Sequence, residues 1–386
     1  MFDWRLAVLA LANFAVGTGS QMLPGMLVEI AADLGRPVSS LGLLVAIAQL
    51  AGGLTAPFLA VATSRFNRRN VLLWALLLCA AGHFLTAFAA GYALLLTARA
   101  GAGVMNTAAT PQSAGIAALL APAERRGRAV ATAVLGYHAA AVFGVPIGVA
   151  LAGAFGWRTS FVVVGAVAVL CALLALRTLP AKLPVAPLNA GSWGTMLRNR
   201  TIALALVFNV LQFAGQNTWF AYLAPLLHRS LDAGPAKIAL LLSWFGCCGV
   251  CGSVFAARVV DRFGAGRLLF ASISLMLAAM LFWPLATGSV AATMAAMGVS
   301  AFGAFTLSSA QQAFLAGADT RFATLAVAFN VSAGFIGASC GALLGAHLID
   351  ALGFGSLNWV AALLMAAALG VLGVARGTGT GNPNKH

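Results

Sequence analysis

The stretch LGLLVAIAQLAGGLTAPFLAVAT at residues 41–63, followed at once by Ser64-Arg-Phe-Asn-Arg-Arg69, decides the class of protein. Its first part is an apolar run long enough to cross the hydrocarbon core of a bilayer as a helix, which takes about 20 residues. Its second part is a short loop with three arginines, and such loops stay on the cytoplasmic side of a membrane. The stretch therefore predicts a transmembrane helix that ends in the cytoplasm.

Apolar runs of this kind fill the whole chain of 386 residues. Hydrophobic residues make up 61% of it and charged residues only 8%, a composition that excludes a water-soluble fold of this length. We predict an all-α membrane protein with twelve transmembrane helices. The expected segments are residues 5–27, 41–63, 70–90, 93–119, 128–152, 158–178, 201–226, 237–258, 267–287, 290–315, 323–348 and 356–375.

The formal net charge of +14 comes from basic residues that lie mostly on one side of these segments. Their distribution therefore indicates the orientation of the protein in the membrane. On the predicted topology Arg99 lies inside a helix. The only basic residues on the outer side of the membrane are Arg36, Arg158, Arg229 and Lys237. The remaining Lys and Arg residues are cytoplasmic, which satisfies the positive-inside rule with both termini in the cytoplasm. We therefore predict a multi-pass protein of a bacterial inner membrane, with the lipid bilayer as its surroundings and no nucleic-acid partner.

The predicted helices fall into two groups of six. A proline-containing stretch at 180–200 separates residues 1–179 from residues 201–376, as a linker between bundles would. The arginine loop recurs at an equivalent place in the second group, as Asp261-Arg-Phe-Gly-Ala-Gly-Arg267. This repeat predicts two pseudo-symmetric six-helix bundles with a binding site between them. We expect a monomer, with a polar, disordered tail at 377–386.

These loops resemble the inner-loop motif of the major facilitator superfamily. Ser64 replaces the acidic residue usual in the first loop, whereas the second loop keeps its aspartate. The order of the motifs is most similar to that of drug and metabolite exporters of the sugar, arabinose and purine-nucleoside efflux type, many of which are proton antiporters. The residues that carry these conformational motifs are Arg65, Arg68, Arg69, Gly144, Pro146, Gly148, Asp261, Arg262 and Gly264, with Arg99 and Gly103 as an R-x-x-x-G pair.

The resemblance implies that the first, fourth, seventh and tenth helices line a central cavity, and all four carry polar residues. Of these residues, Arg99 has the largest free-energy cost of insertion into a bilayer, on the order of 2.5 kcal/mol or more. It therefore indicates a function in the cavity or in conformational change. Reaching out to the outer surface is the alternative for Arg99, and hydrogen bonding between helices is the alternative for the others. The cavity candidates are Asn13, Ser20, Gln21, Arg99, Asn106, Thr110, Asn209, Gln212, Gln216, Trp219, Ser309 and Gln312.

Proton coupling has to use a residue other than a carboxylate in the middle of a helix, because every acidic residue lies in a predicted loop or at a helix end. A histidine can titrate near neutral pH. His138, two turns before the Gly144-Val-Pro-Ile-Gly148 element, is therefore the first candidate, with packing as its alternative role. Glu29 and Asp33 at the outer mouth are the other candidates.

Together these features predict a secondary active transporter that exports small polar or amphipathic molecules by alternating access, with protons moving inward. The uncharged amides of the predicted cavity favour neutral substrates. The sequence has no phosphate-binding loop for ATP, and we expect no cofactor and no metal. A passive facilitator without proton coupling is the main alternative. An intramembrane enzyme is the other, but the paired acids or metal cluster that it needs are missing from the predicted helices.

Overall fold

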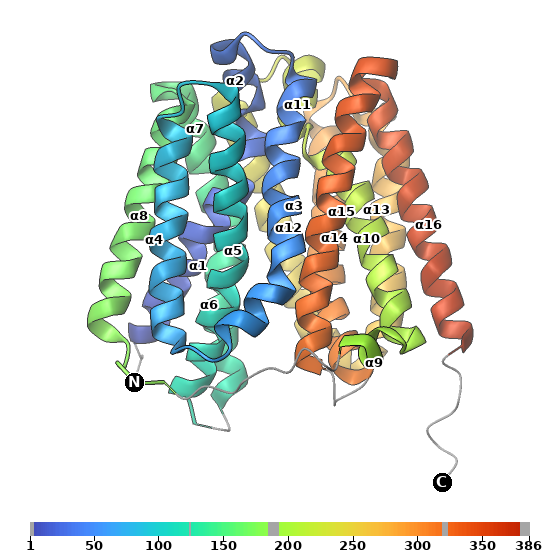
Figure 1. Cartoon of the computed structure of the whole chain (residues 1–386). Coiled ribbons are helices and arrows are strands. Elements are labelled where there is room, and N and C mark those ends of the chain that lie inside the picture. Colours follow the sequence, from blue (N-terminus) through green and yellow to red (C-terminus); the bar gives the residue numbers. More distant parts are fainter. Residues whose placement is uncertain (1–3, 123–124, 184–192, 319–322, 379–386) are drawn as a thin grey trace.

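The computed structural model describes residues 4–122, 125–183, 193–318 and 323–378, and all regular structure in these ranges is helical. The prediction of an all-α protein is therefore confirmed for the described chain. Figure 1 shows the helices standing side by side, with the first part of the chain on the left and the last part on the right. The elements of the first part are α1 (Trp4–Gln21), η1 (Leu23–Met26), α2 (Leu27–Leu34), α3 (Val38–Thr63), α4 (Arg68–Ala87), α5 (Tyr92–Leu120), α6 (Arg126–Ala139), the π-helical turn η3 (Ala140–Gly144), α7 (Val145–Phe155) and α8 (Trp157–Thr178).

The second part begins inside the predicted linker, where a short helix precedes the long ones. In both parts, each predicted segment coincides with one helix or with one interrupted helix. The elements of the second part are α9 (Trp193–Leu197), α10 (Arg200–Phe220), α11 (Leu223–Leu231), α12 (Pro235–Phe263), α13 (Ala265–Ala286), α14 (Val290–Ala318), α15 (Ala323–Leu352), η5 (Phe354–Ser356) and α16 (Leu357–Thr378).

By length and hydropathy, nine helices of the described chain qualify as membrane spans, or ten if α1 is counted together with the bent segment that follows it. The predicted segment 5–27 is not one continuous helix, because the chain bends by 46° between α1 and the segment that follows it. Pro24 in η1 lacks the backbone N–H that a continuing helix needs. Two further long helices, α5 and α10, are less apolar and do not qualify as membrane spans by this criterion. Helix α5 carries Arg99 and Asn106, and α10 carries the amides Asn209, Gln212 and Gln216. These polar side chains lower the mean hydropathy of the two helices.

Two long contacts join the first part to the second. Helix α3 packs along α15, and η3 with α7 packs along α12. Glycines allow the close approach: a Cβ atom at Gly53 would lie 3.0 Å from the Cβ of Phe335, and one at Gly246 would lie 2.5 Å from the carbonyl oxygen of Ala141. Close backbone contacts of this kind are typical of helices that pack in lipid.

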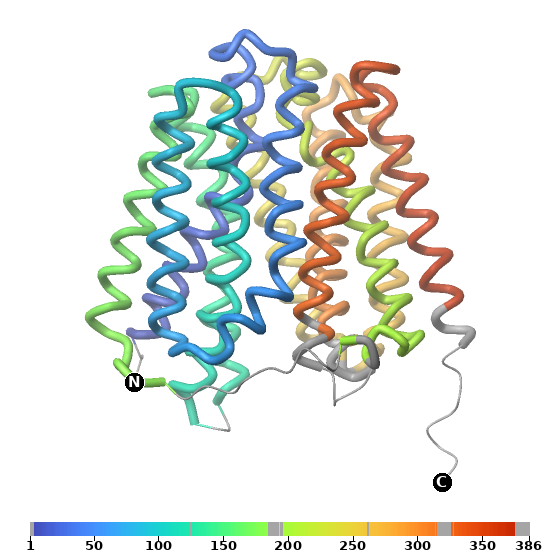
Figure 2. Tube along the Cα trace, in the orientation of Figure 1, coloured from blue at the N-terminus to red at the C-terminus, as the bar shows by residue number. Residues whose placement is uncertain are grey.

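The two ends of the molecule differ in how the parts meet. We call the end with α2 and α11 the α2 end, and the opposite end, where α1 begins and α16 ends, the α9 end (Figures 1 and 2). At the α2 end a single apolar cluster includes residues of both parts, among them Met26, Leu27 and Leu227. At the α9 end the first part has its own cluster around Leu9 and Leu72, which contains no described residue of the second part. Apolar contact between the parts is therefore concentrated at the α2 end.

An aromatic contact bridges the parts at the α9 end. Trp193 of α9 lies between Phe58 of α3 and Phe329 of α15, with both ring centroids at 5.3 Å and both contacts edge to face. The short helix in the predicted linker thus contacts the two helices that meet at the junction.

Candidate functional site

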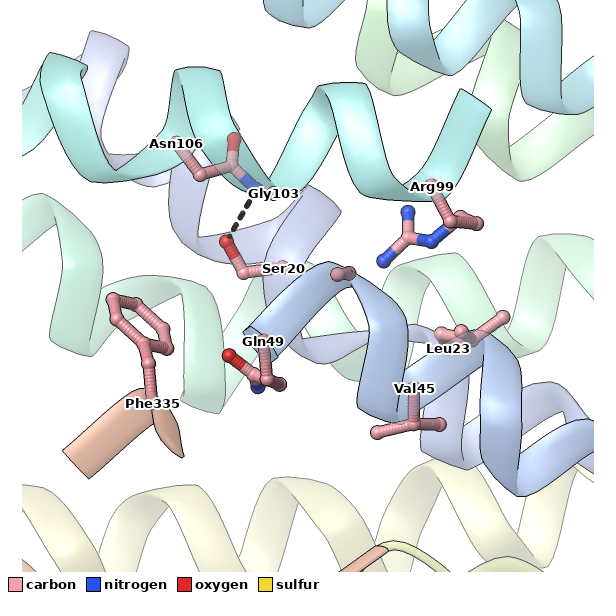
Figure 3. A pocket seen from close by; sticks show the side chains of 9 residues that line it. Ser20, Leu23, Val45, Gln49, Arg99, Gly103, Asn106 and Phe335 are labelled. Carbon is pink, nitrogen blue, oxygen red and sulfur yellow. Dashed lines mark hydrogen bonds between the residues drawn. The ribbon is translucent and has the colours of Figure 1, made fainter. Parts of the chain in front are cut away.

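A small polar cavity lies at the junction, between α1, α3 and α5 of the first part (Figure 3). Ser20, Gln49, Arg99 and Asn106 supply its polar atoms, and Phe335 of α15 closes it from the second part. It offers about 10 Å³ to the centre of a water-sized molecule, which is room for one water molecule or a group of that size. The structure therefore brings three sequence-predicted residues together and adds Gln49, which the sequence analysis missed.

A chain of hydrogen bonds fixes the wall of this cavity. The Asn106 amide nitrogen donates to the hydroxyl oxygen of Ser20 at 2.9 Å, and the Cys79 thiol donates to the Asn106 amide oxygen at 2.9 Å. The same thiol lies 3.4 Å from Nε2 of His83, whose side chain is fully buried. Asn106 is thus held in one orientation by partners on α1 and α4.

Arg99 is buried inside the protein, with 2% of its surface exposed. This burial is incompatible with the alternative that its side chain reaches the outer surface. One guanidinium nitrogen, Nη1, donates to the carbonyl oxygen of Gly19 at 3.5 Å, and the group lies 5.4 Å from the ring centre of Phe161. Its Nε finds no hydrogen-bond partner among the described residues. The charge of Arg99 therefore faces the cavity with little local compensation.

Two predicted cavity residues lie elsewhere. The amide nitrogen of Asn13 donates to the carbonyl oxygen of Ala133 on α6 at 2.9 Å, so Asn13 joins two helices of the first part. Trp219 packs edge to face against Trp283 of α13, with ring centroids 4.7 Å apart. Both side chains are almost fully buried. Neither lines this cavity, because the faces of α1 and α10 that carry them pack against neighbouring helices.

Four further candidates are polar positions that do not line the cavity. The Gln21 amide nitrogen donates to the carbonyl oxygen of Gly17 in its own helix. Ser309 donates in the same way to Phe305. Thr110 is half-buried and Gln312 is exposed.

The second part has its own buried amide cluster, between α10, α14 and α15. The Asn209 amide nitrogen donates to the carbonyl oxygen of Asn330 at 2.7 Å, and the Gln311 amide nitrogen donates to the side-chain oxygen of Asn330 at 3.2 Å. Gln212 donates to Gln216 at 2.9 Å. Ser309 and Gln312 were the residues predicted on α14, whereas Gln311 and Asn330 were not predicted. A polar residue inside an apolar run is the signal that could have found Asn330.

The coupling candidates differ in their surroundings. His138 is half-buried on α6, and its ring centre lies 5.6 Å from that of Phe305 on α14, so it sits where the two parts meet. Its Nδ1 has no hydrogen-bond partner in the described chain. Glu29, in α2, is half-buried, and one of its carboxylate oxygens is also without a described partner. Asp33 instead forms an ion pair with Arg158 and accepts a hydrogen bond from Trp157 at 3.1 Å, so its carboxylate is already engaged.

The arginine-loop motifs are positioned by local contacts. Arg68 Nη1 donates to the side-chain oxygen of Gln112 at 3.4 Å, and Arg69 donates to the carbonyl oxygen of Leu176. Arg65 is exposed. In the second loop Arg262 lies over the ring of Phe263 and Gly264 has a φ of +80°, whereas the side chain of Asp261 lies outside the described residues.

The glycine and proline element on the fifth predicted segment packs against α1 of its own part. A Cβ atom at Gly144 would lie 2.0 Å from the hydroxyl oxygen of Thr18, and one at Gly148 would lie 3.2 Å from the Met22 sulfur. Pro146 stands in the first turn of α7 and, because it lacks an N–H, donates no hydrogen bond to the helical turn before it. Both α7 and the π-helical turn before it, η3, contact α12 of the second part.

Known proteins match this chain along almost its whole length. The sequence model of the Major Facilitator Superfamily matches residues 9–229 and 209–385. The "Uncharacterized MFS-type transporter YbcL" of Bacillus subtilis is 27% identical over 93% of this chain and 92% of its own length. The "Probable sugar efflux transporter" of Mannheimia succiniciproducens is 29% identical over 95% and 92%. The "Chloramphenicol resistance protein" of Streptomyces lividans is 32% identical over 72% and 71%.

Solved structures share the fold. A bacterial homologue of the human lysosomal transporter Spinster, in an inward-facing and occupied conformation, gives a TM-score of 0.73 at 17% identity, over 98% of this chain and 96% of that one. The human organic anion transporter MFSD10 gives a TM-score of 0.73 at 16% identity, over 96% and 100%. The match of the family model to nearly every residue, on a described chain built from helices that meet around a polar cavity, shows that the protein belongs to the major facilitator superfamily of transporters.

Proposed function

We propose that this protein is an exporter of small polar or amphipathic molecules. The observation that carries the proposal is the polar cavity of Ser20, Gln49, Arg99 and Asn106, which lies inside an apolar molecule at the junction of its two parts. Polar groups buried at membrane depth are costly and mark the path of a substrate. The relatives named for sugar efflux and chloramphenicol resistance support export as the direction and these two compound classes as the first to test.

The proposed mechanism is alternating access, with residues 1–179 and 201–376 as the moving bodies and 180–200 as the linker. The shared apolar cluster at the α2 end and the separate cluster of the first part at the α9 end support a conformation in which the bodies are joined at the α2 end. With both termini in the cytoplasm, this is the inward-facing state of the cycle. Glycine-lined contacts such as those at Gly53 and Gly246 let the bodies move against one another without displacing large side chains.

Protons are the proposed driving ion, with His138 as the first carrier and Glu29 as the second. Both have a side-chain atom without a described partner and both lie where the two parts approach, His138 beside Phe305 of α14 and Glu29 in α2, which contacts α11. Asp33 is the weakest of the three candidates, because its ion pair with Arg158 has to break before it can take a proton. The described cavity wall carries no carboxylate, and this favours the passive facilitator as the second candidate function.

Uptake into everted membrane vesicles tests export directly. Vesicles that contain the protein are offered radiolabelled arabinose, inosine or chloramphenicol, with and without an imposed proton gradient. We expect accumulation of at least one compound above control vesicles, and dissipation of the gradient should abolish it. Asn106→Ala should reduce this uptake, whereas Thr97→Ala, at an exposed position of the same helix, should not. Equal uptake in the two variants would contradict a role of the cavity, and equilibration without accumulation would identify a facilitator.

A further inference from the structure

Arg99 carries a buried positive charge for which the described chain supplies no negative partner. The side chain is 2% exposed, and its one hydrogen bond, to the carbonyl oxygen of Gly19, is long at 3.5 Å. The ion pair between Asp33 and Arg158 at the α2 end is the one salt bridge formed by described residues. A guanidinium has five N–H groups, so most of its donors at this site remain available.

The charged and titratable groups around Arg99 do not change this conclusion. The helices packed around it contribute Cys79 and His83, which form a hydrogen-bonded chain with Asn106, and neither is an acid of ordinary strength. All acidic side chains that the structure describes lie at the α2 end of the molecule. Two are in α2, one follows α11 and one is in the last turn of α15. They are Glu29, Asp33, Asp232 and Asp350. An uncompensated buried charge of this kind destabilises the folded protein unless something else neutralises it.

The cavity next to Arg99 is built to take that neutralising group. The guanidinium, the Gln49 amide and the Asn106–Ser20 pair converge on one space, and Phe335 covers it from the second part (Figure 3). A space of about 10 Å³ admits one oxygen atom of an anionic group in this conformation and no complete substrate. The forked donors of arginine match the two oxygens of a carboxylate, one of which can enter this space.

We propose that the Arg99 cavity is a subsite for one negatively charged group, either a carboxylate or similar oxyanion of the transported molecule or a free anion such as chloride. This inference rests on the proposed function and specifies it. The rest of an anionic substrate would lie outside this space, on the side that Phe335 of the second part lines. The expectation of neutral substrates from the sequence is therefore replaced by an anionic or anion-dependent one.

Anion binding is tested first on the purified protein, with formate and chloride as the probes. Each salt is titrated at constant ionic strength, with the bulky buffer anion HEPES as the replacement, and thermal unfolding is followed. A ligand that binds only the folded state raises Tm in a saturable way. We expect this rise in the wild type, its loss in Arg99→Gln and a smaller rise in Arg99→Lys. Arg36→Gln, which removes an exposed arginine at the α2 end, is the control and should show the same saturable rise as the wild type.

Two outcomes of this titration overturn the subsite. One is the absence of any saturable rise in Tm with formate or chloride in the wild type. This outcome can be observed without any variant. The other is a rise of equal size in Arg99→Gln, which places the anion elsewhere. If Arg99→Gln does not fold, Arg99→Lys still tests the subsite. The same midpoint of the Tm titration with formate in Arg99→Lys as in the wild type contradicts the bidentate arginine site.

The source of the anion is tested by transport of a matched pair, arabinose and its aldonic acid arabinonate, into everted vesicles. At least tenfold preference for arabinonate in the wild type, lost in Arg99→Lys, identifies a substrate carboxylate. Uptake of arabinose that requires formate or chloride identifies a free anion. Uptake of arabinose that is indifferent to both anions overturns the subsite and leaves the export function standing. If neither sugar is transported, the export proposal loses these substrates, and the Tm titration alone decides the subsite.

Discussion

The contact between α3 and α5 next to the cavity gives the sharpest test of the structure. A methyl group at Gly103 would lie 2.0 Å from the carbonyl oxygen of Ala48 and 2.7 Å from its carbonyl carbon. Both are backbone atoms of α3, which cannot rotate away, so Gly103→Ala has to push the two helices apart. Gly101, one half-turn earlier on the same helix, is exposed and has no atom within 4 Å of the equivalent position. The pair Gly103→Ala and Gly101→Ala therefore applies one chemical change to two different environments.

The expected magnitude follows from two opposing effects. Overpacking costs about 1–3 kcal/mol, and a clash with backbone belongs at the upper end of this range. Alanine is favoured over glycine inside a helix by about 1 kcal/mol. Gly103→Ala should therefore destabilise the protein by about 2 kcal/mol net, and Gly101→Ala should stabilise it by up to about 1 kcal/mol.

The two variants are compared by unfolding of the purified protein in detergent, with uptake into everted vesicles as the second readout. We expect Gly103→Ala to unfold earlier and to transport less, because separation of α5 from α3 moves Arg99 away from Gln49. Gly101→Ala should keep its activity. If Gly103→Ala is as stable as Gly101→Ala, the close approach of α3 and α5 is wrong, and with it the shape of the cavity.

Three further predictions address coupling, the junction and topology. His138→Gln should leave substrate binding measurable but remove the dependence of uptake on the proton gradient; accumulation driven by a proton gradient alone would show that His138 only packs against Phe305. Trp193→Ala should lengthen the distance between spin labels at the α9 ends of α3 and α15, because it removes two edge-to-face contacts of about 0.5–1.5 kcal/mol each; an unchanged distance distribution would mean that α9 does not hold the junction. Reporter fusions after Leu179 and after residue 376 should both report the cytoplasm, and periplasmic activity at either point would contradict the topology.

Much of the fold was accessible from the sequence because lipid imposes strong rules on a chain. A backbone that crosses a bilayer has to satisfy its own hydrogen bonds, so long apolar runs predict helices with little ambiguity. The twelve expected segments coincide with helices or interrupted helices of the described chain. The bend after α1 was missed, although Pro24 marked the place where the helix could not continue.

The site was predicted only in part, because spacing along a helix tells which residues share a face and not what that face meets. Asn13 and Ser20 are both polar residues of α1, yet one bonds to α6 and the other lines the cavity. On α14, Gln311 and Gln312 are adjacent in sequence but about 100° apart around the helix, so one is buried in the amide cluster and the other is exposed. The sequence by itself determined the helices, the family and the presence of an arginine within a membrane helix. Only the packing of helices from distant parts of the chain decided which polar side chains share a cavity, and whether Arg99 meets an acid there, because these contacts join residues that no local pattern relates.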